Sequence, residues 1–263
     1  MAFLETPDGA TLFFVDEGPR AGNAIVLIHA EPFSTKFWHH NIPALSQKFR
    51  VVAYDTRGRG ESGKTDFGHN IAEYARDLRF VLMALDIHSV LVVGWSLGGS
   101  ILWSYIEQFG HERIVANVNL DQPPYRFVSE DHLAQRVNSI RTRRIAHHTD
   151  AILGYFGPEA PHDQDTLKWM VAECMKTPTS AHVEIVIDSY HSDFRPHMSK
   201  LKVPTQIHWS RYGSITPETA EAMHRSTPNS ELVYFETVGH LIPWVEAAKF
   251  NREIERFASR TLL

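Results

Sequence analysis

The sequence predicts an α/β fold, with a mostly parallel central sheet and helices on both faces. Short apolar strands alternate with amphipathic helices along most of the chain. The alternation is interrupted between residues 127 and 198, where helical patterns follow one another. With 263 residues, the chain can form one large core that carries such an insertion. We therefore expect a core of residues 1–126 and 199–263 and a helical cap at 127–198.

Each expected strand is a short run of apolar, mostly β-branched residues, as is typical of buried parallel strands. The expected strands are residues 11–15, 24–29, 51–54, 88–93, 114–120, 203–209 and 232–235. Helices are expected where apolar residues recur at helical spacing. The expected helices are residues 71–85, 100–109, 131–146, 165–174 and 244–260.

Charge and composition narrow the class of partner. There are 26 Lys and Arg against 31 Asp and Glu, with both signs interspersed, so no surface for nucleic acid is expected. No apolar run approaches the roughly 20 residues of a membrane-spanning helix. The first residues also lack the layout of a signal peptide. We expect a cytoplasmic protein that acts on a small molecule without binding a membrane, and a homodimer is left open.

The pentapeptide Gly-Trp-Ser-Leu-Gly at residues 94–98 is the most informative motif. It lies between the expected strand 88–93 and the expected helix 100–109. A strand, tight turn and helix in this order expose a serine at a helix N-terminus, where amide groups favour developing negative charge. Taken alone, the motif also fits an ordinary glycine-rich turn. In its context it predicts that Ser96 is a nucleophile.

Four segments carry a resemblance to a known family. They are His-Ala-Glu-Pro at 29–32, Asp-Thr-Arg-Gly-Arg-Gly-Glu-Ser at 55–62, the motif at 94–98 and Val-Gly-His at 238–240. In this order and spacing, the chain resembles the α/β-hydrolase family, and more narrowly its small haloperoxidase-like esterases and lactonases. The resemblance implies the α/β-hydrolase fold with an inserted helical cap. This scaffold also hosts dehalogenases, cofactor-free oxygenases and hormone receptors, so activity must be argued from individual residues.

A serine nucleophile needs a base to take its proton, and the base needs an oriented acid partner. His240 is the expected base because it follows the last expected strand, at the sheet edge where the serine emerges. Most members of the family carry the acid in a loop that ends at a proline. Counting back from Pro217 puts Gly213 at that position. Asp121 ends the strand 114–120 at the same edge and is predicted to be the acid, with a turn or capping role as the alternative.

Two backbone amides are expected to form an oxyanion hole. One belongs to Leu97, directly after the serine, and the other to Glu31 in the loop 29–32. Ala30 stands where the resemblance implies glycine, and alanine would be strained there if the position required a positive φ. The Glu31 side chain either contacts substrate or is a solvated loop carboxylate, and both interpretations stay open.

Apolar residues in the cap and beside the motif are candidates for the substrate pocket. The alternative is that most of them pack the cap against the core. The candidates are Ala30, Trp38, Trp95, Tyr125, Tyr155, Trp169 and Met170. Together they predict a medium-sized apolar substrate.

The function predicted from these residues is that of a serine hydrolase of class EC 3.1.1, which cleaves a carboxylic ester or lactone through an acyl-enzyme. No metal or cofactor is expected, because the paired His147 and His148 lack a carboxylate or cysteine at ligand spacing. The first alternative is a cofactor-independent dioxygenase of the same fold that acts on a heteroaromatic substrate. The second is a non-catalytic member that only binds a ligand.

Overall fold

The computed structural model describes residues 2–20, 23–158 and 160–262. Its centre is an eight-stranded sheet in the order β1-β2-β4-β3-β5-β6-β7-β8. β2 pairs antiparallel with β1 and β4, and the pairs from β4 through β8 are parallel. This confirms the predicted fold class. The strands are β1 (Ala2–Glu5), β2 (Thr11–Glu17), β3 (Ala24–Ile28), β4 (Arg50–Tyr54), β5 (Val90–Trp95), β6 (Ile114–Leu120), β7 (Thr205–Ser210) and β8 (Ser230–Phe235).

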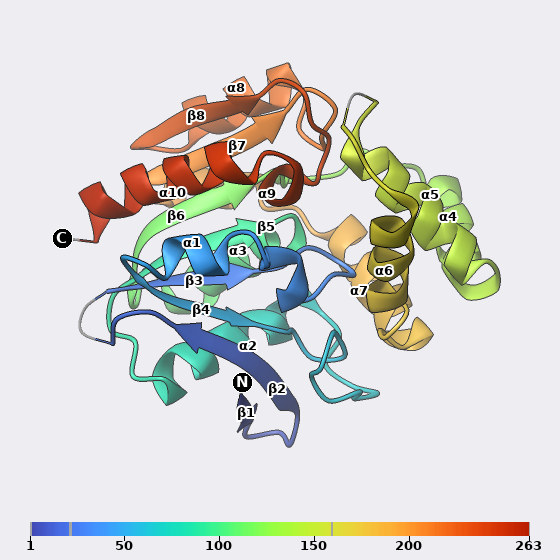
Figure 1. Cartoon of the computed structure of the whole chain (residues 1–263), viewed down its shortest axis with the longest axis horizontal. Helices are drawn as coiled ribbons and strands as arrows, with labels where there is room; N and C mark the ends of the chain where they lie inside the picture. The colour runs from blue at the N-terminus through green and yellow to red at the C-terminus, as the bar shows by residue number, and fades with distance from the viewer. Residues whose placement is uncertain (1, 21–22, 159, 263) are drawn as a thin grey trace.

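Helices cover both faces of the sheet (Figure 1). Successive residues of a strand point to opposite faces, so each central strand contributes to two apolar layers. In β3, Ile25 and Leu27 pack in one layer, while Val26 and Ile28 pack in the other. The first layer includes α1 (Ile42–Leu45), α9 (Ile242–Val245) and α10 (Ala247–Thr261). The second includes α2 (Ile71–Ala84), α3 (Leu97–Phe109) and α8 (Pro217–Ser226).

Four helices between β6 and β7 form a separate group at one end of the sheet (Figure 1). They are α4 (Glu130–Thr142), α5 (Arg144–Phe156), α6 (Gln164–Cys174) and α7 (Thr179–His191). They fall within the segment 127–198 that is expected to form the cap. The short helix η2 (Arg195–Lys200) follows them and places Met198 in the core layer of α2 and α3.

Several local features differ from the expectations. The single helix expected at 131–146 is divided at Arg143, whose φ of −136° and ψ of 37° end α4 before α5 begins. The expected helix 244–260 is divided in the same way at Glu246, with φ −105° and ψ 39°. Strand β1 was not expected, because four residues are too few to show a clear period. An additional short helix, η1 (Thr35–Trp38), follows β3.

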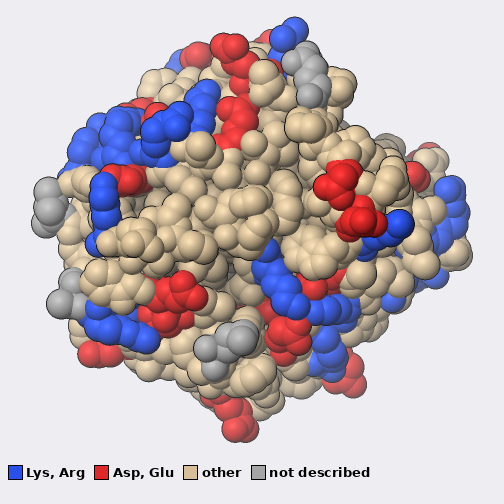
Figure 2. All heavy atoms as spheres, viewed as in Figure 1, with Lys and Arg blue, Asp and Glu red and all other residues tan. Residues whose placement is uncertain are grey.

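Acidic and basic side chains lie side by side on the face drawn in Figure 2, with uncharged areas between them. This mixture matches the balanced composition of the sequence. In the described part of the chain, no helix combines the length and the apolar character needed to cross a bilayer.

The turn between β5 and α3 depends on glycine, because strand and helix approach each other closely there. A Cβ at Gly98 would lie 2.6 Å from the carbonyl oxygen of Ile28 in β3. A Cβ at Gly94 would lie 2.5 Å from the backbone of Gly98. Real Cβ atoms do not approach backbone this closely, so a side chain at either position would push α3 away from the sheet.

We predict that Gly98→Ala lowers the free energy of unfolding by about 1–3 kcal/mol, because the added methyl group overpacks the turn. Gly154→Ala is the matched control: Gly154 lies in α5, and a Cβ added there would have nothing within 4 Å. That substitution should leave the protein as stable or stabilise it by up to about 1 kcal/mol. Chemical denaturation measures both variants, and equal effects would contradict the close-approach argument.

Candidate active site

Ser96 occupies a strained turn at the end of β5. Its φ of 52° and ψ of −118° lie in a region that residues other than glycine rarely adopt, and α3 begins at the next residue. Such strain persists only where the surroundings impose it, and it is concentrated at functional sites. The conformation holds the serine at the N-terminus of α3, as the motif predicts.

The carboxylate of Asp121 is held where β6 ends. Asp121 also has a positive φ, of 53°, and its side chain is completely buried. The backbone amide of Ser214 donates to Oδ2 at 2.8 Å, and that of Ile215 donates to Oδ1 at 3.1 Å. Two amide donors satisfy and orient the buried carboxylate.

His240 lies on the loop after β8 and meets this carboxylate. Its Nδ1 is 2.6 Å from Asp121 Oδ2 and 3.3 Å from Ser214 Oγ. The indole of Trp95 donates to the backbone oxygen of His240 at 3.0 Å, which anchors the loop. Because Nδ1 is engaged by Asp121, Nε2 remains as the ring nitrogen that can exchange a proton with a reacting group.

Ser96 and His240 both line a cavity of about 160 Å³ that residues of α4, α5 and α7 also line. The Ser96 hydroxyl donates to Oε1 of Gln122 at 3.4 Å, a long hydrogen bond, rather than to His240. Hydrogen bonds between a nucleophile and its base are often loose until substrate binds. Sequence reasoning missed Gln122, although its place directly after the predicted acid could have drawn attention to it.

Gly213, where the resemblance implies the acid, lies against the Asp121 carboxylate. A Cβ added at Gly213 would collide with both carboxylate oxygens and would lie 2.6 Å from Oδ1. The carboxylate of Asp121 therefore fills the space into which a side chain at position 213 would project.

The two residues expected to supply oxyanion-hole amides, Leu97 and Glu31, line the same cavity. The oxyanion role stays a prediction. Among the described residues other than glycine, a positive φ occurs at Asp86, Ser96, Arg113, Asp121 and Asn229. Ala30 does not share it, so alanine at that position causes no backbone strain.

The Glu31 side chain is neither freely solvated nor unpaired. Its Oε2 lies 2.8 Å from Nη2 of the buried Arg59, and its Oε1 lies 3.7 Å from Nε2 of His182. Burial raises the pKa of the Glu31 carboxyl, while the charge of Arg59 opposes that shift. The solvated-loop interpretation of Glu31 is thereby corrected.

Most of the expected substrate residues do not line the cavity. Tyr155 lines it, with its ring centroid 5.0 Å from that of His240. The six candidates that do not line it are Ala30, Trp38, Trp95, Tyr125, Trp169 and Met170. This corrects the expectation, because most of these side chains are committed to packing within the protein.

Their contacts show how that packing works. Trp38 and Trp95 are fully buried and pack edge to face, with ring centroids 5.4 Å apart. Trp169 stacks on Trp244 of α9, and the buried Met170 joins the same apolar layer. Tyr125 packs edge to face against Phe127 and lines a different pocket. Aromatic composition alone could not distinguish these packing roles from pocket roles.

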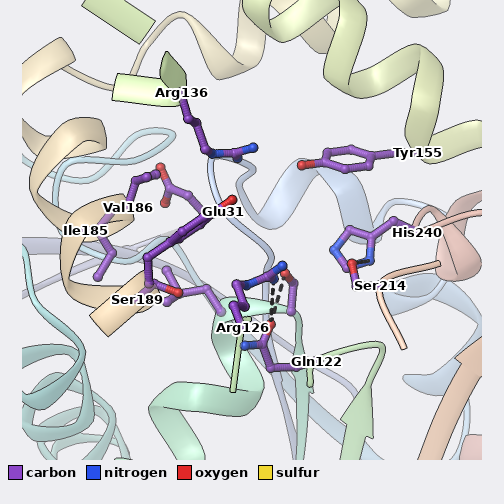
Figure 3. Close-up of a pocket in the computed structure, with 13 residues that line it drawn as sticks. Glu31, Gln122, Arg126, Arg136, Tyr155, Ile185, Val186, Ser189, Ser214 and His240 are labelled. Carbon is purple, nitrogen blue, oxygen red and sulfur yellow. Dashed lines mark hydrogen bonds between the residues drawn. The ribbon is translucent and has the colours of Figure 1, made fainter. Parts of the chain in front are cut away.

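The observed lining is instead largely polar. Figure 3 shows Glu31, Gln122, Arg126 and Arg136 around the cavity, together with Ser214 and His240. The remaining lining residues are Ser96, Leu97, Tyr155, Ile185, Val186, Ser189 and Tyr190. This lining does not match the apolar substrate that the sequence suggested.

Three histidines cluster near Glu31, with His147 and His148 on α5 and His182 on α7. His148 stacks on His182 with ring centroids 5.2 Å apart, and His147 lies 5.8 Å from His182. Burial lowers the pKa of His147 to about 4 and that of His148 to about 3, so both are neutral at pH 7. Within the described residues, no group of His, Cys, Asp and Glu is arranged to hold a metal ion.

We predict that Asp121→Asn lowers kcat for ester cleavage by about 10²- to 10⁴-fold, because the imidazole loses its orientation and its counter-charge. Glu218→Gln is the control, since Glu218 is an exposed carboxylate of α8 outside the cavity. Steady-state kinetics with a chromogenic ester measures both variants. An inactive Glu218→Gln beside an active Asp121→Asn would show that the acid lies elsewhere.

We predict that acidification destabilises the folded protein through the buried histidine His148. The pKa of His148 is about 3 in the folded protein and 6.5 for the free side chain, so the unfolded chain binds more protons between these values. Its contribution to stability is complete above pH 6.5 and is lost as the pH falls. Acidification from pH 7 to 5 should therefore cost about 1–2 kcal/mol through this side chain.

Urea denaturation at several pH values tests this prediction. His148→Leu should show a shallower fall in the free energy of unfolding between pH 7 and 5 than the wild type does. Equal slopes for the two proteins would contradict the assignment.

Comparison with known proteins agrees with the fold. A family model described as alpha/beta hydrolase fold matches residues 23–150. The chain is 27% identical to non-heme chloroperoxidase CPO-A1 of Kitasatospora aureofaciens, over 99% of this chain and 100% of that protein. It is 26% identical to the bifunctional esterase/perhydrolase DCH of Acinetobacter calcoaceticus, over 98% and 99% of the two chains.

Solved structures show the same likeness in three dimensions. The enol-lactonase from Burkholderia xenovorans LB400 superimposes with a TM-score of 0.86 at 20% identity, covering 98% of this chain and 100% of that one. At that identity, the likeness shows the shared fold. Together with the sequence relatives, it identifies the chain as an α/β-hydrolase-fold protein similar to the non-heme haloperoxidase branch of that family.

Proposed function

We propose that this protein is a serine hydrolase that cleaves a carboxylic ester or lactone through an acyl-enzyme on Ser96. The observation that carries the proposal is the 2.6 Å hydrogen bond between His240 and the buried Asp121, beside a serine held at a strained turn. This arrangement supplies a nucleophile, a base and an oriented acid around one cavity. The esterase and lactonase named among the similar proteins support the same class of reaction.

In the first half-reaction, Ser96 Oγ attacks the carbonyl carbon while Nε2 of His240 takes the hydroxyl proton. The amides of Leu97 and Glu31 donate to the carbonyl oxygen as it becomes negative. The bond between the carbonyl carbon and the leaving oxygen then breaks, and His240 returns the proton to that oxygen. In the second half-reaction, water attacks the acyl-enzyme with His240 again as the base. The acid product leaves and the serine hydroxyl is restored.

The cavity limits the size of the acyl group. At about 160 Å³, it is close to cavities that hold a ligand the size of benzene. It is smaller than the sites that enclose drug-sized ligands. A compact acyl group fits this space, so short-chain esters and small lactones are the substrates of choice.

A second acceptor is supported by the names of the relatives, which include a perhydrolase and a chloroperoxidase. If hydrogen peroxide replaces water in the second half-reaction, the same acyl-enzyme releases a peracid and restores Ser96. This reaction needs no additional residue, because peroxide attacks the same carbonyl carbon with the same base.

We predict that Ser96→Ala lowers kcat for short-chain esters by about 10⁶-fold, because no acyl-enzyme can form. Thermal stability should change little, since the turn geometry depends on the glycines rather than on the hydroxyl group. A spectrophotometric assay with chromogenic acetate and butanoate esters measures the loss, and thermal denaturation checks the fold.

Three outcomes separate the alternatives. Activity of Ser96→Ala within tenfold of the wild type would overturn the hydrolase proposal. Consumption of oxygen with a heteroaromatic substrate would favour the dioxygenase. Tight ligand binding without turnover would favour the non-catalytic member.

A further inference from the structure

We propose that Arg126 and Arg136 form a subsite for a carboxylate group of the substrate, so the ester or lactone hydrolysed by this protein carries a negative charge. The inference rests on the proposed hydrolase function and names the substrate class of the same site. The apolar substrate expected from the sequence does not explain the charged side chains around the cavity.

The charges that line the cavity are not balanced. Its lining contains one carboxylate, Glu31, and two guanidinium groups, those of Arg126 and Arg136. Glu31 is already paired with Arg59, which lies outside the lining. Among the described residues, no carboxylate lies within ion-pair distance of Arg126 or Arg136. The cavity therefore has an excess of positive charge that an anionic ligand would neutralise.

The two guanidinium groups lie near one aromatic ring of the lining. Arg136 comes from α4, and Arg126 comes from the segment between β6 and α4. Both guanidinium carbons lie 5.7 Å from the ring centroid of Tyr190 on α7. Figure 3 shows Arg136 entering the cavity from the side opposite Arg126, with its guanidinium toward the Tyr155 hydroxyl. The fork geometry of two such groups suits the paired oxygens of a carboxylate.

Each arginine keeps a buried hydrogen-bond donor that no described residue uses. Nε of Arg126 and Nε of Arg136 are buried and have no hydrogen-bond partner within the described part of the chain. Burial lowers the pKa of Arg136, but Tyr155, Tyr190 and Glu31 raise it by more, so it is held above the ordinary value. An arginine side chain remains charged in any case. Charged residues at such positions are ordinarily paired, and neither Arg126 nor Arg136 has a carboxylate within ion-pair distance among the described residues.

The subsite is close enough to the nucleophile for both to act on one small molecule. Oε1 of Gln122 lies 3.3 Å from Nη2 of Arg126 and 3.4 Å from Oγ of Ser96. A single oxygen atom thus bridges the cation and the serine hydroxyl. A carboxylate held by the arginines would lie only a few bonds from the carbonyl under attack. Half-esters of short dicarboxylic acids, and small lactones that bear a carboxylate, have this spacing.

Matched substrates test the inference. Monomethyl succinate is anionic, and methyl succinamate is its neutral counterpart of nearly the same shape. Proton release in a pH-stat gives kcat/KM for both. The wild type should prefer the anionic ester by at least about tenfold, the effect expected of a charge-assisted hydrogen bond. Arg136→Met should lower this preference by about 10- to 100-fold.

Arg141→Met is the control variant, because Arg141 is an exposed arginine on the same helix. It should keep the preference of the wild type. Equal or better cleavage of methyl succinamate by the wild type would overturn the inference while leaving the hydrolase function intact. Failure to cleave any ester, together with failure of a fluorophosphonate to label Ser96, would instead overturn the proposed function.

A second readout needs no turnover. Succinate should slow the labelling of Ser96 by a fluorophosphonate in the wild type and in Arg141→Met, but not in Arg136→Met. Absence of protection in the wild type would overturn the inference. Protection by inorganic phosphate but not by succinate would overturn its assignment to a carboxylate.

Discussion

The hydrogen bond between Asp121 and His240 is the constraint around which the candidate site is organised. It joins the end of β6 to the loop after β8, across the strand β7 that lies between them in the sheet. The amides of Ser214 and Ile215 complete the environment of the carboxylate, so the loop after β7 contributes to the same site. Three loops therefore converge on one buried carboxylate, at the edge where parallel strands end and where open α/β sheets bind their ligands.

The sheet could be predicted from the sequence because its parallel strands are buried on both faces. Residues 114–120 form β6 as expected, and Ser96 lies where its strand and helix pattern placed it. The division of the cap helix at Arg143 could not be predicted, because no glycine or proline marks it. Strand β1 could not be predicted either, because it is defined by its pairing with β2 rather than by a sequence pattern of its own.

In the candidate site, too, some residues could be predicted from local sequence patterns, while others depend on tertiary packing. Asp121, Ser96 and His240 could be brought together from the sequence because each follows a recognisable strand, and parallel strands end at a common edge. Arg136 lies on a cap helix whose pattern is that of a solvated surface. Only the packing of that helix against α5 and α7 brings its guanidinium to the cavity that Ser96 lines. Trp95 was misassigned for the converse reason, because its indole turns inward to hold the His240 loop.

The contact between Gly213 and Asp121 has a consequence for how such a site could change over evolutionary time. A Cβ at position 213 would collide with the Asp121 carboxylate, so an acid at position 213 is incompatible with Asp121 in its present place. A side chain gained at position 213 would clash while Asp121 remained, and loss of Asp121 alone would leave the histidine unsupported. Either substitution alone would therefore give a less active or less stable protein. The acid therefore cannot move between the two loops by one substitution at a time without loss of function. We expect proteins that descend from this chain to retain the aspartate and the glycine together.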